Sequence, residues 1–167
     1  KTGIPFLPMS MAKGVLPDDH PLCAASARSL VLGQADVVML VGARLNWLLN
    51  HGKGKKWNPK VKFIQVDICA EEMDSNREIE APIVGDIASS LDLMLCKMEP
   101  FNIKCGEAWI NSINAVKQVN AEKMQKKLTT PTQPMNYFNT LKVVSDVLQD
   151  YKDIYLVNEG ANALDNT

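Results

Sequence analysis

The chain has 167 residues, of which 46% are hydrophobic and 22% charged, and its formal net charge is −1. This length and composition exclude a disordered chain and allow a buried core. The balanced charge argues against a nucleic-acid partner and no apolar run approaches the roughly 20 residues that cross a bilayer, so we expect neither a nucleic-acid nor a membrane partner.

Residues 1–100 alternate strand-like apolar runs with helical segments. The run "DVVMLV" at 36–41 is rich in β-branched residues, which is typical of a parallel strand buried on both faces. We predict strands at 4–7, 36–41, 61–66 and 83–84, helices at 23–33 and 87–98, and a helical turn at 47–49. This alternation predicts the α/β class, with a doubly wound parallel sheet.

The character of the chain changes beyond residue 100. A long polar helix is expected at 106–128, with a narrow apolar stripe formed by Trp109, Ile113, Val116 and Val119. The stretch "TTPTQP" reads as a linker, and a second helix at 137–148 and a strand at 154–157 follow it. We therefore divide the chain into an α/β domain (1–100), a helical linker (101–134) and the start of another domain (135–167).

Polar residues follow two of the predicted strands at the end where α/β proteins usually bind ligands. Asp67 follows "FIQV", where a carboxylate can accept hydrogen bonds from ribose hydroxyls, although a turn or helix-cap aspartate is the commoner reading. Arg44 follows the strand at 36–41, where a guanidinium can hold a phosphate or form a surface salt bridge. Asp86 is expected to cap the helix at 87–98.

The sequence offers no catalytic acid, base or nucleophile. His20 and His51 lie in separate predicted loops, and neither has a serine or cysteine nucleophile pattern around it. Gly42 is not followed by the GxGxxG fingerprint, and "GKGKK" lacks the spacing of a phosphate-binding loop.

We expect the cysteines and the tryptophans to have structural roles. The four cysteines are widely spaced, with no CxxC and no paired histidines, so we expect reduced thiols, a cytoplasmic location and no metal site: Cys23, Cys69, Cys96 and Cys105. The three tryptophans are expected to pack in the interior: Trp47, Trp57 and Trp109.

Longer stretches resemble one family. "GIPFLPMSMAKGVLPDDHP", "LVGARLNWLLNHGKG", "FIQVDICAEEMDSN" and "PIVGDI" resemble the central domain of thiamine-diphosphate-dependent enzymes. Within that family they are most similar to the oxalyl-CoA decarboxylases, with the 2-hydroxyacyl-CoA lyases as near relatives. "MNYFNTL" and "LVNEGANALDNT" extend the resemblance into the start of the cofactor-binding C-terminal domain.

The resemblance implies three α/β domains, of which this chain holds part. We expect the chain to lack the N-terminal domain, the opening strand and helix of the central domain, and most of the C-terminal domain. The family's cofactor-activating glutamate and its metal and diphosphate motif are then absent. We therefore expect the chain by itself to be inactive.

The resemblance also implies binding residues. Arg44 would hold an ADP phosphate, Asp67 the ribose hydroxyls, and Ile87 the adenine side, with ADP acting as an activator. Two further sets are implied, for CoA and for thiamine diphosphate. The CoA set is Ala25, Ser26, Ala27, Arg28, Ser29 and Asn120, and the thiamine diphosphate set is Tyr137, Ala161, Asn162 and Ala163.

For the whole enzyme, the resemblance implies decarboxylation of oxalyl-CoA to formyl-CoA and carbon dioxide. The cofactors would be thiamine diphosphate and Mg²⁺, and the assembly a homo-oligomer, either a dimer or a tetramer. A fragment of a 2-hydroxyacyl-CoA lyase and a non-catalytic module that binds ADP or CoA are the alternatives. A dehydrogenase-type NAD domain is disfavoured because the GxGxxG fingerprint is absent.

Overall fold

The computed structural model describes residues 2–155 and 157, and it divides the chain into two compact units. The first unit spans Lys1–Lys117 and the second Gln118–Thr167, so the division falls inside a long helix, α3 (Glu107–Thr129). The three-part division predicted from the sequence stays a prediction.

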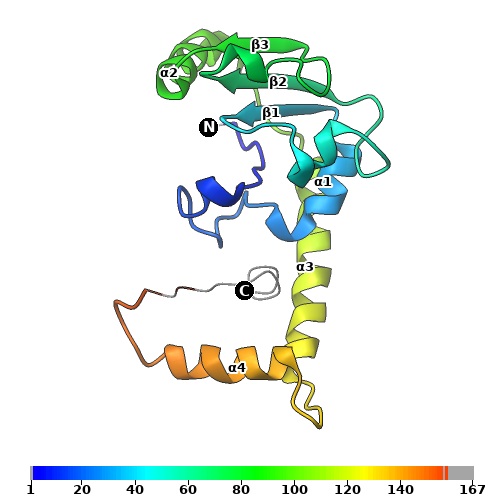
Figure 1. Ribbon diagram of the computed structural model, residues 1–167, viewed down its shortest axis with the longest axis vertical. Helices are drawn as coiled ribbons and strands as arrows, with labels where there is room; N and C mark the ends of the chain where they lie inside the picture. The colour runs from blue at the N-terminus through cyan, green and yellow to red at the C-terminus, as the bar shows by residue number, and fades with distance from the viewer. Residues whose placement is uncertain (1, 156, 158–167) are drawn as a thin grey trace. The chain divides into compact units, whose positions relative to one another are not determined.

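A three-stranded parallel sheet forms the centre of the first unit (Figure 1). Its strands are β1 (Val37–Val41), β2 (Lys62–Asp67) and β3 (Ala81–Val84), in the order β1-β2-β3. The register pairs Val41 with Val66 and Asp67 with Val84. This sheet and the helices between its strands confirm the predicted α/β class.

The helices of the first unit follow the predicted order. The α-helices that lie wholly in this unit are α1 (Arg28–Gln34) and α2 (Ile87–Met98), and the 3₁₀ segments are Ser10–Ala12, Ala25–Ala27, Trp47–Gly52, Ala70–Glu72 and Glu99–Phe101. The helix predicted at 23–33 is thus a 3₁₀ turn followed by α1. Helix α2 has the predicted bounds, and Asp86 caps its N-terminal end: the Asp86 Oδ1 accepts the Ser89 N–H at 2.9 Å.

The strand predicted at 4–7 is reduced to one parallel bridge between Phe6 and Cys23. The Phe6 N–H donates to the Leu22 carbonyl oxygen at 3.0 Å, and the Ala24 N–H donates to the Phe6 carbonyl oxygen at 2.9 Å. Pro5 and Pro8 flank Phe6 and have no N–H to donate. The ladder therefore cannot extend beyond this pair.

The expectation that β1 is buried on both faces is wrong. Leu40 is 5% exposed, whereas Val37, Met39 and Val41 on the opposite face are 52%, 38% and 41% exposed. Successive side chains of a strand point to opposite faces. Among the described residues β1 is an edge strand, and one of its faces packs on the core while the other is open.

Two apolar clusters hold the first unit together. The larger cluster consists of Leu32, Leu40, Leu45, Leu49, Trp57, Val61, Phe63 and Ile79. In the smaller one, Ile113 of α3 is 3% exposed and packs with Ala24 and Ala27, beside Trp109 and Val116. The stripe predicted on the long helix is confirmed up to Val116, whereas Val119, in the second unit, is 48% exposed.

The second unit contains the end of α3 and the helix α4 (Tyr137–Leu148), whose bounds were predicted. The strand predicted at 154–157 is not formed at the positions that the structure describes, because Ile154, Tyr155 and Val157 lie outside any strand. A strand needs a hydrogen-bonding partner. No strand is present in the described part of this unit to provide one.

Candidate functional site

The carboxyl ends of the three strands meet at one edge of the sheet (Figure 1). The Gly42 N–H donates to the Val66 carbonyl oxygen, and the Gly85 N–H donates to the Asp67 carbonyl oxygen, each at 2.9 Å. The chain thus leaves β1, β2 and β3 at neighbouring points. The structure brings the three residues expected to bind ADP, namely Arg44, Asp67 and Ile87, to this edge.

Arg44 already has a partner. Its Nη1 lies 3.1 Å from Glu72 Oε1, and the two side chains are 60% and 29% exposed. Glu72 ends the 3₁₀ turn that follows β2. The salt bridge that competed with phosphate binding as an interpretation of Arg44 is therefore present, and a phosphate would have to exchange with the Glu72 carboxylate.

Asp67 ends β2 and is 8% exposed. Its Oδ1 accepts the Cys69 N–H at 3.0 Å, which is the turn interaction that competed with ribose binding. This hydrogen bond orients the carboxylate at the sheet edge. The residue thus stabilises the turn, and its part in ribose binding stays a prediction.

Gly42 allows α2 to approach the end of β1. Its φ is +58°, and a Cβ built at this position would lie 2.6 Å from Ile87 Cδ1. A side chain here would therefore have to displace Ile87, the first residue of α2. The glycine thus explains how Ile87 reaches the same sheet edge as Arg44.

Asp86 precedes Ile87 and is exposed. Hydrogen bonds from the Ser89 backbone N–H and the Ser89 hydroxyl lower the pKa of the Asp86 carboxyl from its usual value. A carboxylate at a helix N-terminus also interacts favourably with the helix dipole. The residue is a helix cap, as the sequence indicated.

The residues expected to bind CoA lie mostly in one turn. Ala25–Ala27 form a 3₁₀ turn that leads into Arg28 and Ser29, the first residues of α1. Ala27 is buried, at 1% exposed. The Arg28 guanidinium donates a hydrogen bond from Nη2 to the Leu48 carbonyl oxygen at 3.0 Å. Asn120 lies on α3 in the second unit, so its place beside this turn stays a prediction.

The residues expected to bind thiamine diphosphate are described only at Tyr137. This residue begins α4, is 42% exposed, and packs its ring edge-to-face with Phe138 at 6.3 Å. Ala161, Asn162 and Ala163 lie outside the described residues.

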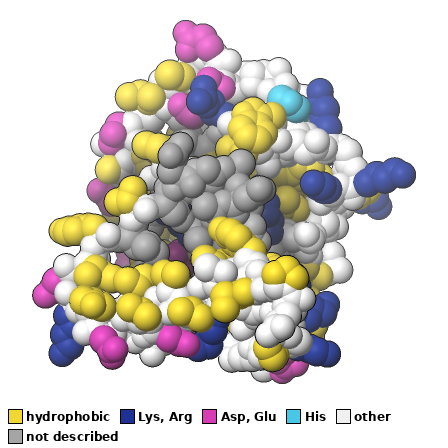
Figure 2. Space-filling model, turned by 60° about the horizontal axis from the view of Figure 1, so that its bottom comes forward, with side chains coloured by type: hydrophobic (Ala, Val, Ile, Leu, Met, Phe, Trp, Pro, Cys, Tyr) yellow, Lys and Arg dark blue, Asp and Glu magenta, His cyan; other side chains and the backbone are white. Residues whose placement is uncertain are grey.

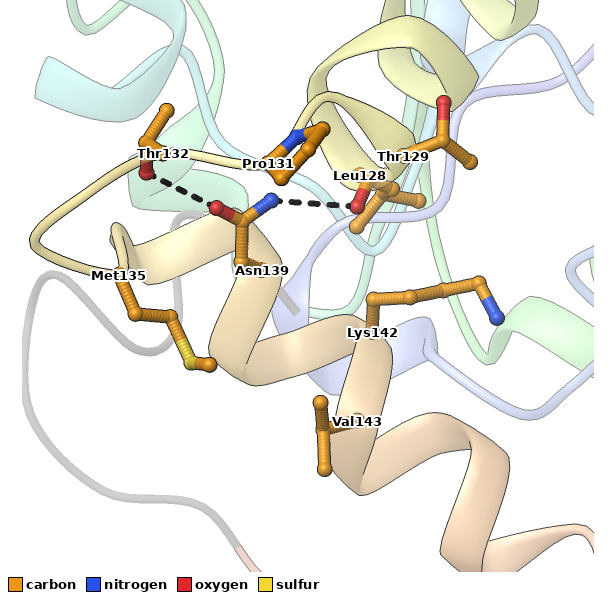
Figure 3. A pocket seen from close by; sticks show the side chains of 8 residues that line it. All are labelled: Leu128, Thr129, Pro131, Thr132, Met135, Asn139, Lys142 and Val143. Carbon is orange, nitrogen blue, oxygen red and sulfur yellow. Dashed lines mark hydrogen bonds between the residues drawn. The ribbon is translucent and has the colours of Figure 1, made fainter.

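A cavity of about 320 Å³ lies in the second unit, between the end of α3 and the start of α4 (Figure 3). It is lined by Leu128, Thr129, Pro131, Thr132, Met135, Asn139, Lys142 and Val143. Asn139 Nδ2 donates to the Leu128 and Thr130 carbonyl oxygens at 3.3 and 2.9 Å, and its Oδ1 accepts the Thr132 hydroxyl at 2.9 Å. Asn139 therefore ties the linker to α4.

Trp47 corrects the expectation that all three tryptophans are packed inside. Trp57 is 4% exposed and Trp109 packs beside Ile113, but Trp47 is 74% exposed. It lies next to a smaller cavity of about 100 Å³ in the first unit. Composition alone does not distinguish these environments, because the exposure depends on how the loop after β1 folds back.

Residues 2–155 and 157 contain no group of three or more His, Cys, Asp or Glu side chains placed to hold a metal ion. The helices of this part of the chain include none that is both long and apolar enough to cross a membrane. All four cysteines are free thiols, as expected.

Comparison with known proteins gives one family match, to the thiamine pyrophosphate enzyme central domain, over residues 1–94. Oxalyl-CoA decarboxylase of Escherichia coli (strain K12) is 61% identical over 163 residues, which are 98% of this chain and 29% of the relative. The chain therefore spans less than a third of that relative.

Lyases of the same family are more distant. The 2-hydroxyacyl-CoA lyase of Oryza sativa subsp. japonica is 42% identical over 168 residues, covering 98% of this chain and 29% of the relative. The 2-hydroxyacyl-CoA lyase 1 of Homo sapiens is 38% identical over 164 residues, which cover 97% of this chain and 28% of the relative. The sequence is thus more similar to the decarboxylase than to either lyase.

Proposed function

This chain belongs to the thiamine pyrophosphate enzymes, because its residues 1–94 match their central domain, and on that basis we propose that the whole protein is an oxalyl-CoA decarboxylase. One observation carries the proposal: identity to the Escherichia coli decarboxylase is 61%, against 42% for the rice lyase, over the same share of this chain. Because the match covers 29% of the decarboxylase, activity belongs to a longer protein than this chain.

The proposed reaction converts oxalyl-CoA and a proton into formyl-CoA and carbon dioxide. The bond between the two oxalyl carbons breaks, carbon dioxide leaves, and the proton joins the thioester carbon. Thiamine diphosphate, when bound, supplies the electron sink for this step. The residues of this chain are proposed to bind and orient ligands, and no catalytic residue is assigned among them.

Three ligand sets follow from the proposal. At the sheet edge, Arg44 would pair with an ADP phosphate, Asp67 would accept from the ribose hydroxyls, and Ile87 would contact the adenine; their shared edge supports this grouping. The CoA set comprises Ala25, Ser26, Ala27, Arg28, Ser29 and Asn120. ADP is the proposed activator.

For thiamine diphosphate, Tyr137 is the described candidate, and its partly exposed ring at the start of α4 could contact an aromatic ring of the cofactor. Ala161, Asn162 and Ala163 complete the proposed set. We assign no Mg²⁺ ligand to the described residues. The whole enzyme is proposed to be a cytoplasmic dimer or tetramer.

The test is turnover by the full-length protein. We expect formyl-CoA and carbon dioxide from oxalyl-CoA when thiamine diphosphate and Mg²⁺ are both present, and no product without the cofactor. Cofactor-independent turnover would refute the proposal. The 167-residue chain alone should give no product under the same conditions.

A 2-hydroxyacyl-CoA lyase is the second candidate, favoured by the 42% identity to the rice enzyme. Both enzymes would use the same cofactor, so the substrate distinguishes them. Faster cleavage of 2-hydroxyacyl-CoA than decarboxylation of oxalyl-CoA would identify the lyase.

A third hypothesis concerns this chain by itself: it could be a nucleotide-binding module without catalytic activity. Calorimetric titration of the folded chain with ADP and with CoA tests it. Heat with neither ligand would reduce the chain to a structural role.

A further inference from the structure

Trp47 is an exposed aromatic residue on a loop with an unusual backbone. Its side chain is 74% exposed, and the neighbouring Leu48 is 42% exposed. Tryptophan normally buries most of its large apolar surface. Together these two residues present apolar surface to solvent, and both line the smaller cavity.

The loop that carries Trp47 is held in one conformation. Asn50, His51 and Gly52 have successive φ values of 49°, 54° and 66°. The left-handed region is unfavourable for residues other than glycine, and it persists where the surroundings enforce it, often at ligand sites. Here Trp57 Nε1 donates to the Leu49 carbonyl oxygen and Arg77 Nη1 donates to the Gly52 carbonyl oxygen, both at 2.8 Å.

The cavity beside Trp47 is basic. It has a volume of about 100 Å³ and is lined by Arg28, Leu32, Trp47, Leu48, Leu49, Asn50, Lys56 and Trp57. Two of these side chains are cationic and none is acidic. Arg28 uses Nη2 for the Leu48 carbonyl oxygen at 3.0 Å, which orients a guanidinium that has five N–H donors.

We propose that Trp47, Arg28 and Lys56 form a subsite for the nucleotide end of an acyl-CoA substrate. The cavity has room for a phosphate group and not for a whole nucleotide, so the phosphate pairs with Arg28 and Lys56. The base lies outside and stacks on the Trp47 indole. Trp47 and Lys56 thereby extend the CoA set, and this inference rests on the proposed function.

The chemistry of CoA matches this arrangement. Its nucleotide end carries an adenine ring together with several phosphates, so one ligand offers both a π-face and negative charge. Indole rings stack well on bases, and guanidinium and ammonium groups pair with phosphate. ADP shares this chemistry but is proposed to bind at Arg44, so the two ligands make separate arms of the test.

The experiment is calorimetric titration of the 167-residue chain with CoA, 3′-dephospho-CoA and ADP. Trp47→Ala should weaken CoA binding by about tenfold, because base stacking is lost. Lys56→Gln should weaken it several-fold. Lys60→Gln is the matched control, since Lys60 is exposed on the same basic segment but does not line the cavity.

The titrations distinguish a specific CoA subsite from its absence. Weaker binding by Trp47→Ala and Lys56→Gln, with Lys60→Gln and ADP affinity unchanged, supports the subsite. If 3′-dephospho-CoA binds more weakly than CoA to the native chain, and if Lys56→Gln does not weaken the binding of 3′-dephospho-CoA further, the 3′-phosphate is the group that Lys56 binds. Equal CoA affinity in all variants, or no heat at millimolar CoA, overturns it.

Two further results bear on the proposal. Equal losses in Lys56→Gln and Lys60→Gln would indicate diffuse charge attraction, and that too overturns the subsite. Failure of the proposed decarboxylase activity is measured separately by turnover of the full-length protein. That result would leave a CoA effect at Trp47 standing.

Discussion

At the scale of single residues, Arg44 shows how a proposed ligand group can be occupied by a protein partner. Glu72 Oε1 lies 3.1 Å from Arg44 Nη1, so a phosphate must compete with a carboxylate. An exposed ion pair of this kind contributes about 0.2–1 kcal/mol. Glu72 is therefore expected to weaken the binding of ADP moderately without preventing it.

We predict that Glu72→Gln tightens ADP binding by about two- to fivefold, because Arg44 loses its competing anion. Calorimetric titration of the chain measures the change. Glu71→Gln is the matched control, since Glu71 lies in the same turn and is exposed. Unchanged or weaker ADP binding in Glu72→Gln would contradict the competition.

Gly42→Ala should destabilise the first unit. Alanine disfavours a φ of +58°, at a cost of about 1–2 kcal/mol, and its Cβ would lie 2.6 Å from Ile87 Cδ1. Urea unfolding followed by circular dichroism measures the loss. Gly106→Ala is the control, because nothing lies within 4 Å of a Cβ there and its φ is not positive. Equal stability of the two variants would argue against the close approach of α2.

At the scale of elements, α2 depends on its cap. The pKa of the Asp86 carboxyl is lowered from 3.8 by hydrogen bonds from Ser89, so the ionised form is favoured in the folded state. The ionised Asp86 carboxylate therefore stabilises the folded state at pH values above its pKa in the unfolded chain. This stabilisation is lost as the pH falls through its pKa in the folded chain.

Asp86→Ala should accordingly lower the melting temperature near neutral pH. The difference from the native chain should shrink as pH falls below about 4. Asp92→Ala on the exposed face of the same helix should have a smaller effect. A difference that stays constant down to pH 2 would show that the charge of Asp86 does not matter.

The linker between α3 and α4 depends on Asn139. Removing its amide in Asn139→Ala breaks the hydrogen bonds to Leu128, Thr130 and Thr132, and we expect a loss of about 1–3 kcal/mol. Amide hydrogen exchange in α4 should become faster. Ser145→Ala, an exposed site on the same helix, is the control. Unchanged exchange in Asn139→Ala would show that the linker is held by other contacts.

At the scale of the whole chain, each unit presents an open apolar face. In the first unit this face is formed by β1 residues Val37, Met39 and Val41. In the second unit, Val143, Val144 and Val147 of α4 are 53%, 45% and 54% exposed. Figure 2 shows hydrophobic side chains gathered in a band on the face of the molecule turned toward the viewer. Apolar patches of this kind bind hydrophobic dyes.

We predict that the isolated chain enhances the fluorescence of anilinonaphthalene sulfonate, and that the double variant Val143→Lys, Val147→Lys reduces this signal. The helical circular dichroism should not change, because both side chains are about half exposed. Ser145→Lys adds charge to the same helix without removing apolar surface, so it serves as the control. Equal dye binding by both variants would place the exposed apolar surface elsewhere.

Much of the fold could be predicted because its signals are local. The runs at β1 and β2 and the helices α2 and α4 carry their own periodicity and caps, and they form where expected. Parallel strands bring their carboxyl ends to one edge, so the placement of Arg44 and Asp67 at the same edge of the sheet also followed from the pattern. The short segment at 4–7 could not extend as a strand because prolines flank its single bridge.

The sequence by itself determined the α/β class, the order of the three strands and their helices, the Asp86 cap of α2 and the family, because each depends on neighbouring residues or on long matching stretches. The salt bridge of Arg44 with Glu72, the exposure of Trp47 and the one-sided burial of β1 could be learned only from the folded chain. Each of these joins residues distant in sequence or depends on which strand lies alongside. Such contacts have no local pattern, so tertiary packing decides them.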